Sequence, residues 1–381
     1  MKTKKLNKVI LLDAGSIENW VGGIYYIRNI VYSLLMSEKI VSKYEIVVFV
    51  RERYQDVYAC FDNIIVETLK KDATIFEKVR KKIQLLSKYD IKFIYNYSNI
   101  NWVGLGKKKA VYWIPDFQNN YYPEFFSVKE NVIKQKTDKM ILGTNVKLVL
   151  SSNQAKADAY QFYEKINAQI KVVHFVSFIL PELEKITEEQ SNLVLNNYQL
   201  NSKKYIYIAN QFWKHKNHKV VFEAVKLLQN MGKLKNVEFI FTGAPDTRKD
   251  PEYSRLIQSY FDDKELSRYV KNLGFIDRTE QLIIMKYADF IIQPSLFEGW
   301  GTVLEDAKVL DKTVLLSNIP VHFEQKNDKC IFFNRDSAQD LAEKIEEVYN
   351  MEKMENPQEG ITRMKKEAYE YSKKLEELFE S

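Results

Sequence analysis

The sequence of 381 residues has only two cysteines, Cys60 and Cys330, and only four histidines. Two thiols so far apart do not make the disulfide framework of a small secreted domain or a cysteine-rich zinc site. Among the histidines only His215 and His218 stand at metal-ligand spacing, and we interpret both as surface residues. The sequence therefore predicts no bound metal, no cofactor and a reducing compartment, the cytoplasm.

Long apolar runs are also missing, since none approaches the about twenty residues that a membrane-spanning helix needs. The lysine-rich beginning is followed by an apolar run, residues 9–12, that is too short for a signal peptide and ends at Asp13. We expect a first strand there. The GxxxxGK[ST] phosphate loop and the GxSxG serine turn are absent as well, which argues against a P-loop nucleotidase and an α/β-type serine hydrolase.

The composition, with 45% hydrophobic and 13% aromatic residues, is that of a globular protein long enough for two domains. Its charge is uneven. Residues 1–180 hold 28 Lys and Arg against 17 Asp and Glu, a net of +11, and subtraction from the totals of 57 and 51 leaves 29 against 34, a net of −5. Nucleic-acid binding would fit the basic half, but no matching motif is present.

Part of this positive charge lies between residues 75 and 88, where five basic residues alternate with isoleucine, phenylalanine, valine and leucine, and Lys107 to Lys109 follow. Such a mixture is typical of a helix that binds an anionic membrane surface or an acidic partner. It is equally typical of a solvated helix face whose apolar residues cover a core. Both interpretations stay open at this point.

Short apolar runs alternate with helix-like segments along the whole chain, which favours two mostly parallel sheets covered on both faces. The strand-like runs are residues 9–12, 46–50, 64–66, 93–95, 110–113 and 148–150 in the first half, and 205–209, 237–242, 290–293 and 314–317 in the second. We predict an α/β protein with a first Rossmann-like domain over residues 1–180, a linker over 181–204, a second such domain over 205–357 and a terminal helix over 358–381.

The segment 289–325, DFIIQPSLFEGWGTVLEDAKVLDKTVLLSNIPVHFEQ, joins a buried strand, a glycine turn, a helix and a second strand. Backbone amides at the turn and at the start of the helix suit an anion or sugar hydroxyls. Glu298 and Glu305 flank this turn, and carboxylates accept hydrogen bonds from vicinal hydroxyls. Acidic residues also favour helix starts for dipole reasons alone.

The runs PSLFEGWGTVLEDAK and SNIPVHFEQ resemble the donor-site signature of glycosyltransferase family 4, and in particular its subset with EGW-type loops. Many members separate the two glutamates by seven residues, as in EGFGLPVLE, whereas six residues separate Glu298 and Glu305 here. The resemblance implies retaining nucleotide-sugar enzymes of GT-B fold. In that fold two Rossmann-like domains face a central cleft, the second domain binds the donor, and the terminal helix crosses back to the first.

The resemblance also implies roles for the residues around the turn. Glu298 would hold hydroxyls of the donor sugar, and Glu305 would hold the ribose. The backbone that surrounds the donor would come from Gly299, Trp300, Gly301 and Thr302.

Lys216 lies between a predicted strand and a predicted helix, where doubly wound domains bind ligands. It resembles the family lysine that neutralises the leaving diphosphate, and a preorganised cation stabilises that charge as it develops. Gln211 stands near the place of the usual arginine, so Lys214 is the candidate for the second positive charge. Exposed lysines at a helix start are the alternative interpretation.

Glycines and strand ends supply the other donor contacts that the resemblance implies. Gly22 and Gly23 would approach the donor phosphate from the first domain, although surface turns also use such pairs. Gly243 ends a strand at the ligand edge of the second domain. The backbone of Phe275 and Ile276 would meet the nucleotide base.

Asp116, Gln118 and Asn119 belong to WIPDFQNNYYPEFF, which resembles an acceptor-side segment of the family. Related sequences often carry histidine where Asn119 stands. Asp116 would orient or deprotonate the acceptor hydroxyl from a strand end. An N-cap or turn role for Asp116 is the alternative.

Together with these residues, the resemblance implies a retaining hexosyltransferase that moves a sugar from a GDP- or UDP-linked donor to a glycan or lipid-linked glycan. We expect such transfer in bacterial-type surface polysaccharide assembly, in the cytoplasm or peripherally on the inner membrane face. The alternatives are a nucleotide-sugar 2-epimerase of the same fold and a degenerate glycan-binding relative without turnover. The second alternative is kept because Gln211 and Asn119 depart from the family pattern.

Overall fold

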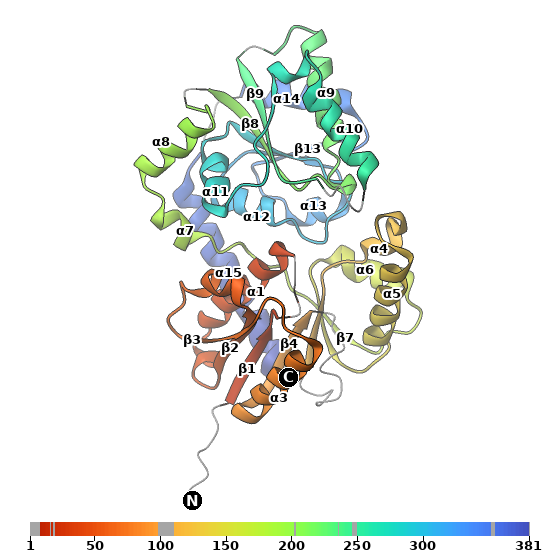
Figure 1. The fold of residues 1–381 in the computed structure, drawn as a ribbon, viewed down its shortest axis with the longest axis vertical. Coiled ribbons are helices and arrows are strands. Elements are labelled where there is room, and N and C mark those ends of the chain that lie inside the picture. Colours follow the sequence, from red (N-terminus) through yellow and green to blue (C-terminus); the bar gives the residue numbers. More distant parts are fainter. Residues whose placement is uncertain are drawn as a thin grey trace, which may run out of the picture. The chain divides into compact units, whose positions relative to one another are not determined.

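A computed structural model describes residues 8–15, 17, 20–97, 110–201, 203–234, 236–245, 250–351 and 355–380. The basic residues Lys107 to Lys109 lie outside these ranges. The chain forms two compact units (Figure 1). Unit 1 comprises residues 1–178 and 365–381, and unit 2 comprises residues 179–364.

Unit 1 is built on a seven-stranded sheet in which every neighbouring pair is parallel. The strand order is β3-β2-β1-β4-β5-β6-β7. The strands are β1 (Lys8–Asp13), β2 (Glu45–Arg51), β3 (Ile64–Leu69), β4 (Asp90–Tyr97), β5 (Ala110–Ile114), β6 (Lys147–Leu150) and β7 (Gln169–Val172).

The helices of unit 1 are α1 (Val21–Leu35), α2 (Glu38–Val41), α3 (Ile75–Lys88), α4 (Gln118–Tyr121), α5 (Val128–Leu142) and α6 (Asn153–Phe162), with 3₁₀ turns η1 (Glu52–Tyr58) and η4 (Pro123–Phe125). The C-terminal α15 (Pro357–Glu380) enters this unit at residue 365. The last turns of α15 pack against unit 1. Ser37 Oγ donates to Glu376 at 2.6 Å, and Phe379 packs edge-on against Phe93.

Unit 2 repeats the plan with six parallel strands in the order β10-β9-β8-β11-β12-β13. The strands are β8 (Lys204–Ala209), β9 (Val237–Thr242), β10 (Val270–Asn272), β11 (Phe290–Gln293), β12 (Val314–Ser317) and β13 (Cys330–Phe333). The helices are α7 (Leu180–Lys185), α8 (Glu188–Asn197), α9 (His218–Asn230), α10 (Pro251–Asp262), α11 (Arg278–Tyr287), α12 (Thr302–Val309), α13 (Pro320–Gln325) and α14 (Ala338–Tyr349), with η5 (Lys214–Lys216) and η6 (Leu266–Arg268).

The central strands are buried on both faces, which is why they read as continuous apolar runs rather than as alternating ones. One face of the unit 2 sheet packs against α9, α10 and α14 around Phe222, Phe241 and Leu341. In Figure 1 α11 and α12 lie on the other side of that sheet. The predicted α/β fold with two doubly wound Rossmann-like parts is confirmed.

Three strands have no counterpart among the apolar runs named above, namely β7, β10 and β13. All three lie at sheet edges, and polar residues interrupt the apolar run in β7 (QIKV) and β10 (VKN). Residues 181–204, treated above as a linker, contain α8 and all but the first residue of α7, and they fall within unit 2. The predicted domain boundaries otherwise stay a prediction.

In both sheets the strand order reverses beside the first strand of the unit. The reversal lies between β1 and β4 in unit 1 and between β8 and β11 in unit 2. Loops at such a switch point leave the sheet in opposite directions and open a crevice at the carboxyl ends of the strands. Within the described ranges, no helix is both long and apolar enough to cross a membrane.

Candidate functional site

The switch point of unit 2 carries a buried polar pair formed by the residues that end its two central strands. Asn210 follows β8, and Gln293 is the last residue of β11. Asn210 Nδ2 donates to Gln293 Oε1 at 2.9 Å, and Gln293 Nε2 donates back to Asn210 Oδ1 at 3.3 Å. This reciprocal amide pair satisfies groups that would be costly to bury alone and fixes the side chain of Gln293.

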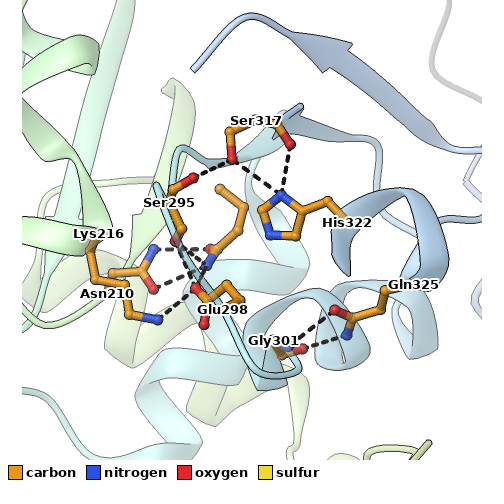
Figure 2. Close-up of polar contacts among 9 residues, drawn as sticks. Asn210, Lys216, Ser295, Glu298, Gly301, Ser317, His322 and Gln325 are labelled. Carbon is orange, nitrogen blue, oxygen red and sulfur yellow. Dashed lines mark hydrogen bonds and ion pairs between the residues drawn. The ribbon is translucent and has the colours of Figure 1, made fainter. Parts of the chain in front are cut away.

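Glu298 extends this network from the loop between β11 and α12. Its Oε1 accepts from Lys216 Nζ at 2.6 Å, from Ser295 Oγ at 2.6 Å and from Gln293 Nε2 at 3.0 Å. Figure 2 shows Lys216 and Ser295 directed towards this carboxylate. Among the described residues none donates to the second oxygen, so Glu298 is held rigidly by Oε1 and keeps Oε2 as an acceptor.

The charge of Glu298 is stable in this environment. Burial alone would raise the pKa of the carboxyl, but the Lys216 ammonium and the hydroxyl of Ser295 outweigh it and lower the pKa to about 2. An ammonium has three donors. Lys216 can therefore keep its bond to Glu298 while it donates to another acceptor.

The loops at this edge of the sheet are joined to one another by hydrogen bonds. Leu296 N donates to the carbonyl of His215 at 2.7 Å, which ties the loop after β11 to the loop after β8. Gln211 Oε1 accepts from Ala244 N at 2.8 Å, which ties the loop after β8 to the loop after β9. Gln211 thus serves the backbone in this structure, and its predicted role in donor binding stays a prediction.

Gly243 is required where the loops after β8 and β9 meet. Its φ is +139°, and a Cβ at this position would lie 2.2 Å from the carbonyl oxygen of Asn210. Its amide donates to the carbonyl of Gly274 at 2.8 Å, which joins the loop after β10 to the same edge. The predicted site residue Gly243 therefore lets three strand ends approach closely.

The turn before α12 is clamped by Gln325 from α13. Gly301 N donates to Gln325 Oε1 at 3.0 Å, and Gln325 Nε2 donates to the carbonyl of Gly301 at 2.7 Å (Figure 2). The amide of Gly301 is thus already bonded. Gly301 is the N-cap of α12 and supplies no side chain, so the first turn beginning at Thr302 has no side-chain cap. Backbone N–H groups at such an end suit an anionic or hydroxyl ligand.

Glu305 lies inside the unit rather than at the turn. Lys308 Nζ contacts its two oxygens at 3.2 and 3.3 Å, and Gln325 Nε2 donates to Oε1 at 2.8 Å. The next residue, Asp306, has seven residues between itself and Glu298, the spacing common in the family that the sequence resembles. Arg278 binds both Asp306 oxygens at 2.7 Å. The sequence analysis did not identify Asp306, because it assigned the second glutamate of the family motif to Glu305, which follows Leu304.

His322 is buried beside Glu298 at the start of α13. Its Nδ1 lies 2.9 Å from the carbonyl of Ser317, and since a carbonyl only accepts, Nδ1 carries the proton. Burial lowers the pKa of His322 to about 4, so the ring is neutral at neutral pH and its Nε2 is an acceptor. Ser317 Oγ donates to the carbonyl of Ser295 at 2.6 Å, which ties the end of β12 to the loop that carries Glu298 (Figure 2).

The remaining predicted residues of unit 2 surround this centre without a bond to Glu298. Lys214 is exposed on η5, two residues before Lys216. Phe275 is exposed and Ile276 half-buried in the loop before α11. The half-buried Gly299 and Trp300 lie in the turn itself. The prediction that His218 is a surface residue is wrong, because His218 is buried against Phe212.

In unit 1 the predicted residues lie at the corresponding edge of the other sheet. Gly22 and Gly23 form the first turn of α1 beneath Trp20. A Cβ on Gly23 would lie 2.5 Å from the Trp20 ring, and that ring stacks on Trp113 with centroids 5.5 Å apart. The glycine at position 23 is therefore explained by packing, and its contact with a donor phosphate stays a prediction.

Asp116 and Asn119 both make internal contacts. Asp116 Oδ1 accepts from the backbone N–H of Gln118 at 3.0 Å, the turn interaction that the sequence left as an alternative. Asn119 is buried, and its Nδ2 donates to Asn131 Oδ1 at 3.2 Å. Lys134 lies 3.4 Å from the carbonyl of Asp116. An acceptor role for these residues stays a prediction.

The structure brings together side chains that the sequence analysis did not single out. They are Asn210, Gln293, Ser295, Asp306, Ser317, His322 and Gln325. Polar residues directly after buried strands, as in Ala-Asn and Gln-Pro-Ser, were the available signal for the first three. Nothing in the sequence indicated the clamp by Gln325, because it links residues 24 positions apart.

Residues 196–370 match the family model "Glycosyl transferases group 1". This range covers the strand ends, the Glu298 network and α12 to α14. No curated protein sequence matches the chain significantly.

Solved structures resemble the whole chain at low sequence identity. Alr3699/HepE of Anabaena in complex with UDP and glucose has a TM-score of 0.66 and 15% identity over 96% of this chain and 94% of its own. A trehalose-phosphate synthase of Burkholderia xenovorans reaches 0.68 at 10% identity over 98% and 100%. WaaG, a glycosyltransferase involved in lipopolysaccharide biosynthesis, reaches 0.58 at 12% over 96% and 95%. These likenesses show the GT-B fold.

Proposed function

Because the chain belongs to the group 1 glycosyltransferases through residues 196–370, we propose that it transfers a sugar from a nucleotide diphosphate donor held by unit 2. Transfer from a nucleotide sugar is the activity of this family. The single observation that supports the location of the donor is the Glu298 network at the switch point between β8 and β11. Ligands of doubly wound sheets bind at this place.

The two charged residues of the network, Glu298 and Lys216, have different roles in this proposal. Glu298 Oε2 accepts hydrogen bonds from hydroxyls of the donor sugar, because Oε1 already accepts three hydrogen bonds from the protein. Lys216 donates to the diphosphate and offsets the negative charge that grows on it as the glycosidic bond breaks. The ion pair between Lys216 and Glu298 at 2.6 Å keeps both groups preorganised for their roles.

The second carboxylate of the site is either Glu305 or Asp306. Asp306 has the family spacing and is bound by Arg278, which follows the predicted base-binding residues Phe275 and Ile276. We propose that the ribose lies on this side, near Asp306. Glu305 then supports the turn through Gln325.

The proposal includes retention of the anomeric configuration, with attack and departure on the same face of the sugar. No side-chain nucleophile is required for that course, because the leaving phosphate itself accepts the proton of the acceptor. Asp116 and the polar residues of α4 are the candidates for acceptor contact. A glycan or lipid-linked glycan in surface polysaccharide assembly is the proposed acceptor, with WaaG as a structural neighbour that acts in lipopolysaccharide biosynthesis.

A uridine donor is the first to test, since Alr3699/HepE has been solved with UDP and glucose and with UDP-glucose. UDP-glucose, UDP-galactose, GDP-mannose and their free nucleotides are each added to the protein, and its melting temperature is measured. A ligand that binds the native state raises it by mass action. Release of nucleotide diphosphate is then followed with the best donor.

Lys216→Ala and Glu298→Gln are expected to lower the rate of nucleotide release at least about a hundredfold. Lys219→Ala is the matched control, because the side chain of that exposed lysine on α9 forms an ion pair with Glu223 at 3.4 Å and, among the described residues, is not bonded to the Glu298 network. A protein that binds donors without releasing nucleotide would be the degenerate relative. Conversion of the donor into its 2-epimer would identify the epimerase.

A further inference from the structure

Helix α3 of unit 1 is amphipathic in the reverse sense. Its apolar side chains point outward, with exposed fractions of 80% for Ile75, 75% for Phe76, 50% for Val79 and 61% for Ile83. At 100° per residue these four positions lie within an arc of about 100°. The sequence analysis left open whether these residues cover a core, and the structure shows that they do not.

The inward side of α3 is occupied mainly by charged groups. Lys81 and Lys88 donate to Glu67 of β3 at 2.8 and 2.6 Å, and Lys82 lies 3.8 Å from Asp13 of β1. Leu85 is the one fully buried residue of the described helix. Packing against the core therefore anchors only the C-terminal part of α3.

The N-terminal end of α3 is nevertheless well defined. Thr74 Oγ1 accepts from Glu77 N at 3.2 Å, and Glu77 Oε2 accepts from Thr74 N at 2.7 Å, which forms a complete capping box. A capped helix with an outward apolar stripe about two turns long is a persistent surface feature. Apolar patches of this kind on a soluble protein mark an interaction site.

Positive charge lies along one edge of the stripe. Arg80 is exposed next to Val79, and Lys70 and Lys71 are exposed in the turn before the helix. Arg80, Lys70 and Lys81 also line a pocket of about 530 Å³ beside α3, together with Glu52 and Glu77. The apolar stripe with its cationic edge is complementary to a surface that has anionic groups on the outside and an apolar layer under them.

We propose that α3 docks unit 1 on an anionic lipid bilayer, with Ile75, Phe76, Val79 and Ile83 inserted among the acyl chains near the head groups. Arg80 and Lys70 then contact the lipid phosphates. Interfacial helices have this arrangement of apolar and cationic side chains and do not span the membrane. The inference goes beyond sugar transfer and stands without it, because no residue of α3 belongs to the donor site of unit 2.

The test is binding of the full-length protein to vesicles of phosphatidylcholine alone and of phosphatidylcholine with phosphatidylglycerol, measured by co-sedimentation. Binding is expected only with phosphatidylglycerol. The double variant Phe76→Ser, Ile83→Ser is expected to bind about a hundredfold more weakly, since two large apolar side chains no longer insert. Arg80→Gln should weaken binding about fivefold, and less at high salt.

Leu193→Ser on α8 and Arg255→Gln on α10 are the matched controls, because both residues are exposed in unit 2 and should leave vesicle binding unchanged. Nucleotide release from the donor, measured without vesicles, should be the same in every variant, so loss of docking and loss of transferase activity are distinguishable. Equal sedimentation of the wild type with and without phosphatidylglycerol would overturn the proposal. Concentration-dependent dimers that the Phe76→Ser, Ile83→Ser variant loses would overturn it in favour of a second copy of the chain.

Discussion

Replacing Lys216 by methionine removes the cation from the centre of the network and leaves Glu298 charged and nearly buried. The loss of one partner of a buried pair costs about 3–5 kcal/mol, and the two remaining donors, Ser295 and Gln293, offset part of that. We therefore expect Lys216→Met to lower the free energy of unfolding of unit 2 by about 2–4 kcal/mol at pH 8.

The pH dependence of this loss follows from the sign of each shift. In the wild type the pKa of Glu298 is lowered to about 2, so its contribution to stability is complete above the ordinary value of 4.5 and is lost as the pH falls towards 2. In Lys216→Met burial acts on the carboxyl without the ammonium and raises its pKa. The penalty then exists above the raised pKa and disappears when Glu298 is protonated. The difference between the two proteins should shrink from pH 8 to pH 4.

The assay is hydrogen exchange of backbone amides in β8 and β11 at increasing urea concentration, which reports unit 2 separately from unit 1. Glu298→Gln, Lys216→Met is the reference, because it has no charge at this site and should show no pH dependence from it. Lys219→Met controls for the removal of an exposed lysine. A penalty for Lys216→Met that is absent, or that is equal at pH 8 and pH 4, would refute the account of the pair.

Three further outcomes are expected. Gly243→Ala should destabilise unit 2 by about 2–4 kcal/mol in urea unfolding, because its Cβ would overlap a backbone carbonyl, whereas Gly232→Ala, with φ +67° and open space, should cost about 1 kcal/mol. Gln325→Leu leaves the amide of Gly301 without its acceptor, so the KM for the donor should rise several-fold in steady-state assays while the variant stays folded. In unit 1 burial opposes ionisation of Glu67, but hydrogen bonds from two lysines and a tyrosine lower its pKa to about 2. The wild type should therefore lose stability between pH 4.5 and pH 2, and Glu67→Gln should lose less over the same range in acid unfolding followed by circular dichroism.

The fold could be predicted from the sequence because buried parallel strands read as continuous apolar runs, and ten of these runs were recognised. The places of Glu298 and Lys216 after two buried strands could be predicted as well, since each follows such a run. Their direct contact could not, because it joins residues 82 positions apart and depends on β8 and β11 being neighbours in the sheet.

Other features depend on which way a side chain points, and periodicity alone does not decide that. Glu305 and Asp306 are adjacent in the sequence, yet one contacts α13 and the other contacts α11. The same holds for α3. Its stripe is periodic in the sequence, but the exposure of the apolar side chains and the bonds of Lys81 and Lys88 to Glu67 are needed to show that the apolar side faces outward.

The central claim is that Glu298 holds the sugar and Lys216 the diphosphate of a donor bound to unit 2. Calorimetric titration with UDP-glucose and with UDP, or with the sugar nucleotide that gives the largest thermal shift and its free nucleotide, tests it most directly. Glu298→Gln should lower the affinity for the sugar nucleotide at least about tenfold and leave the affinity for the free nucleotide nearly unchanged. Lys216→Ala should lower the affinity for both ligands. Equal losses of both ligands in Glu298→Gln, or unchanged affinities in Lys216→Ala, would contradict the assignment of the two charges.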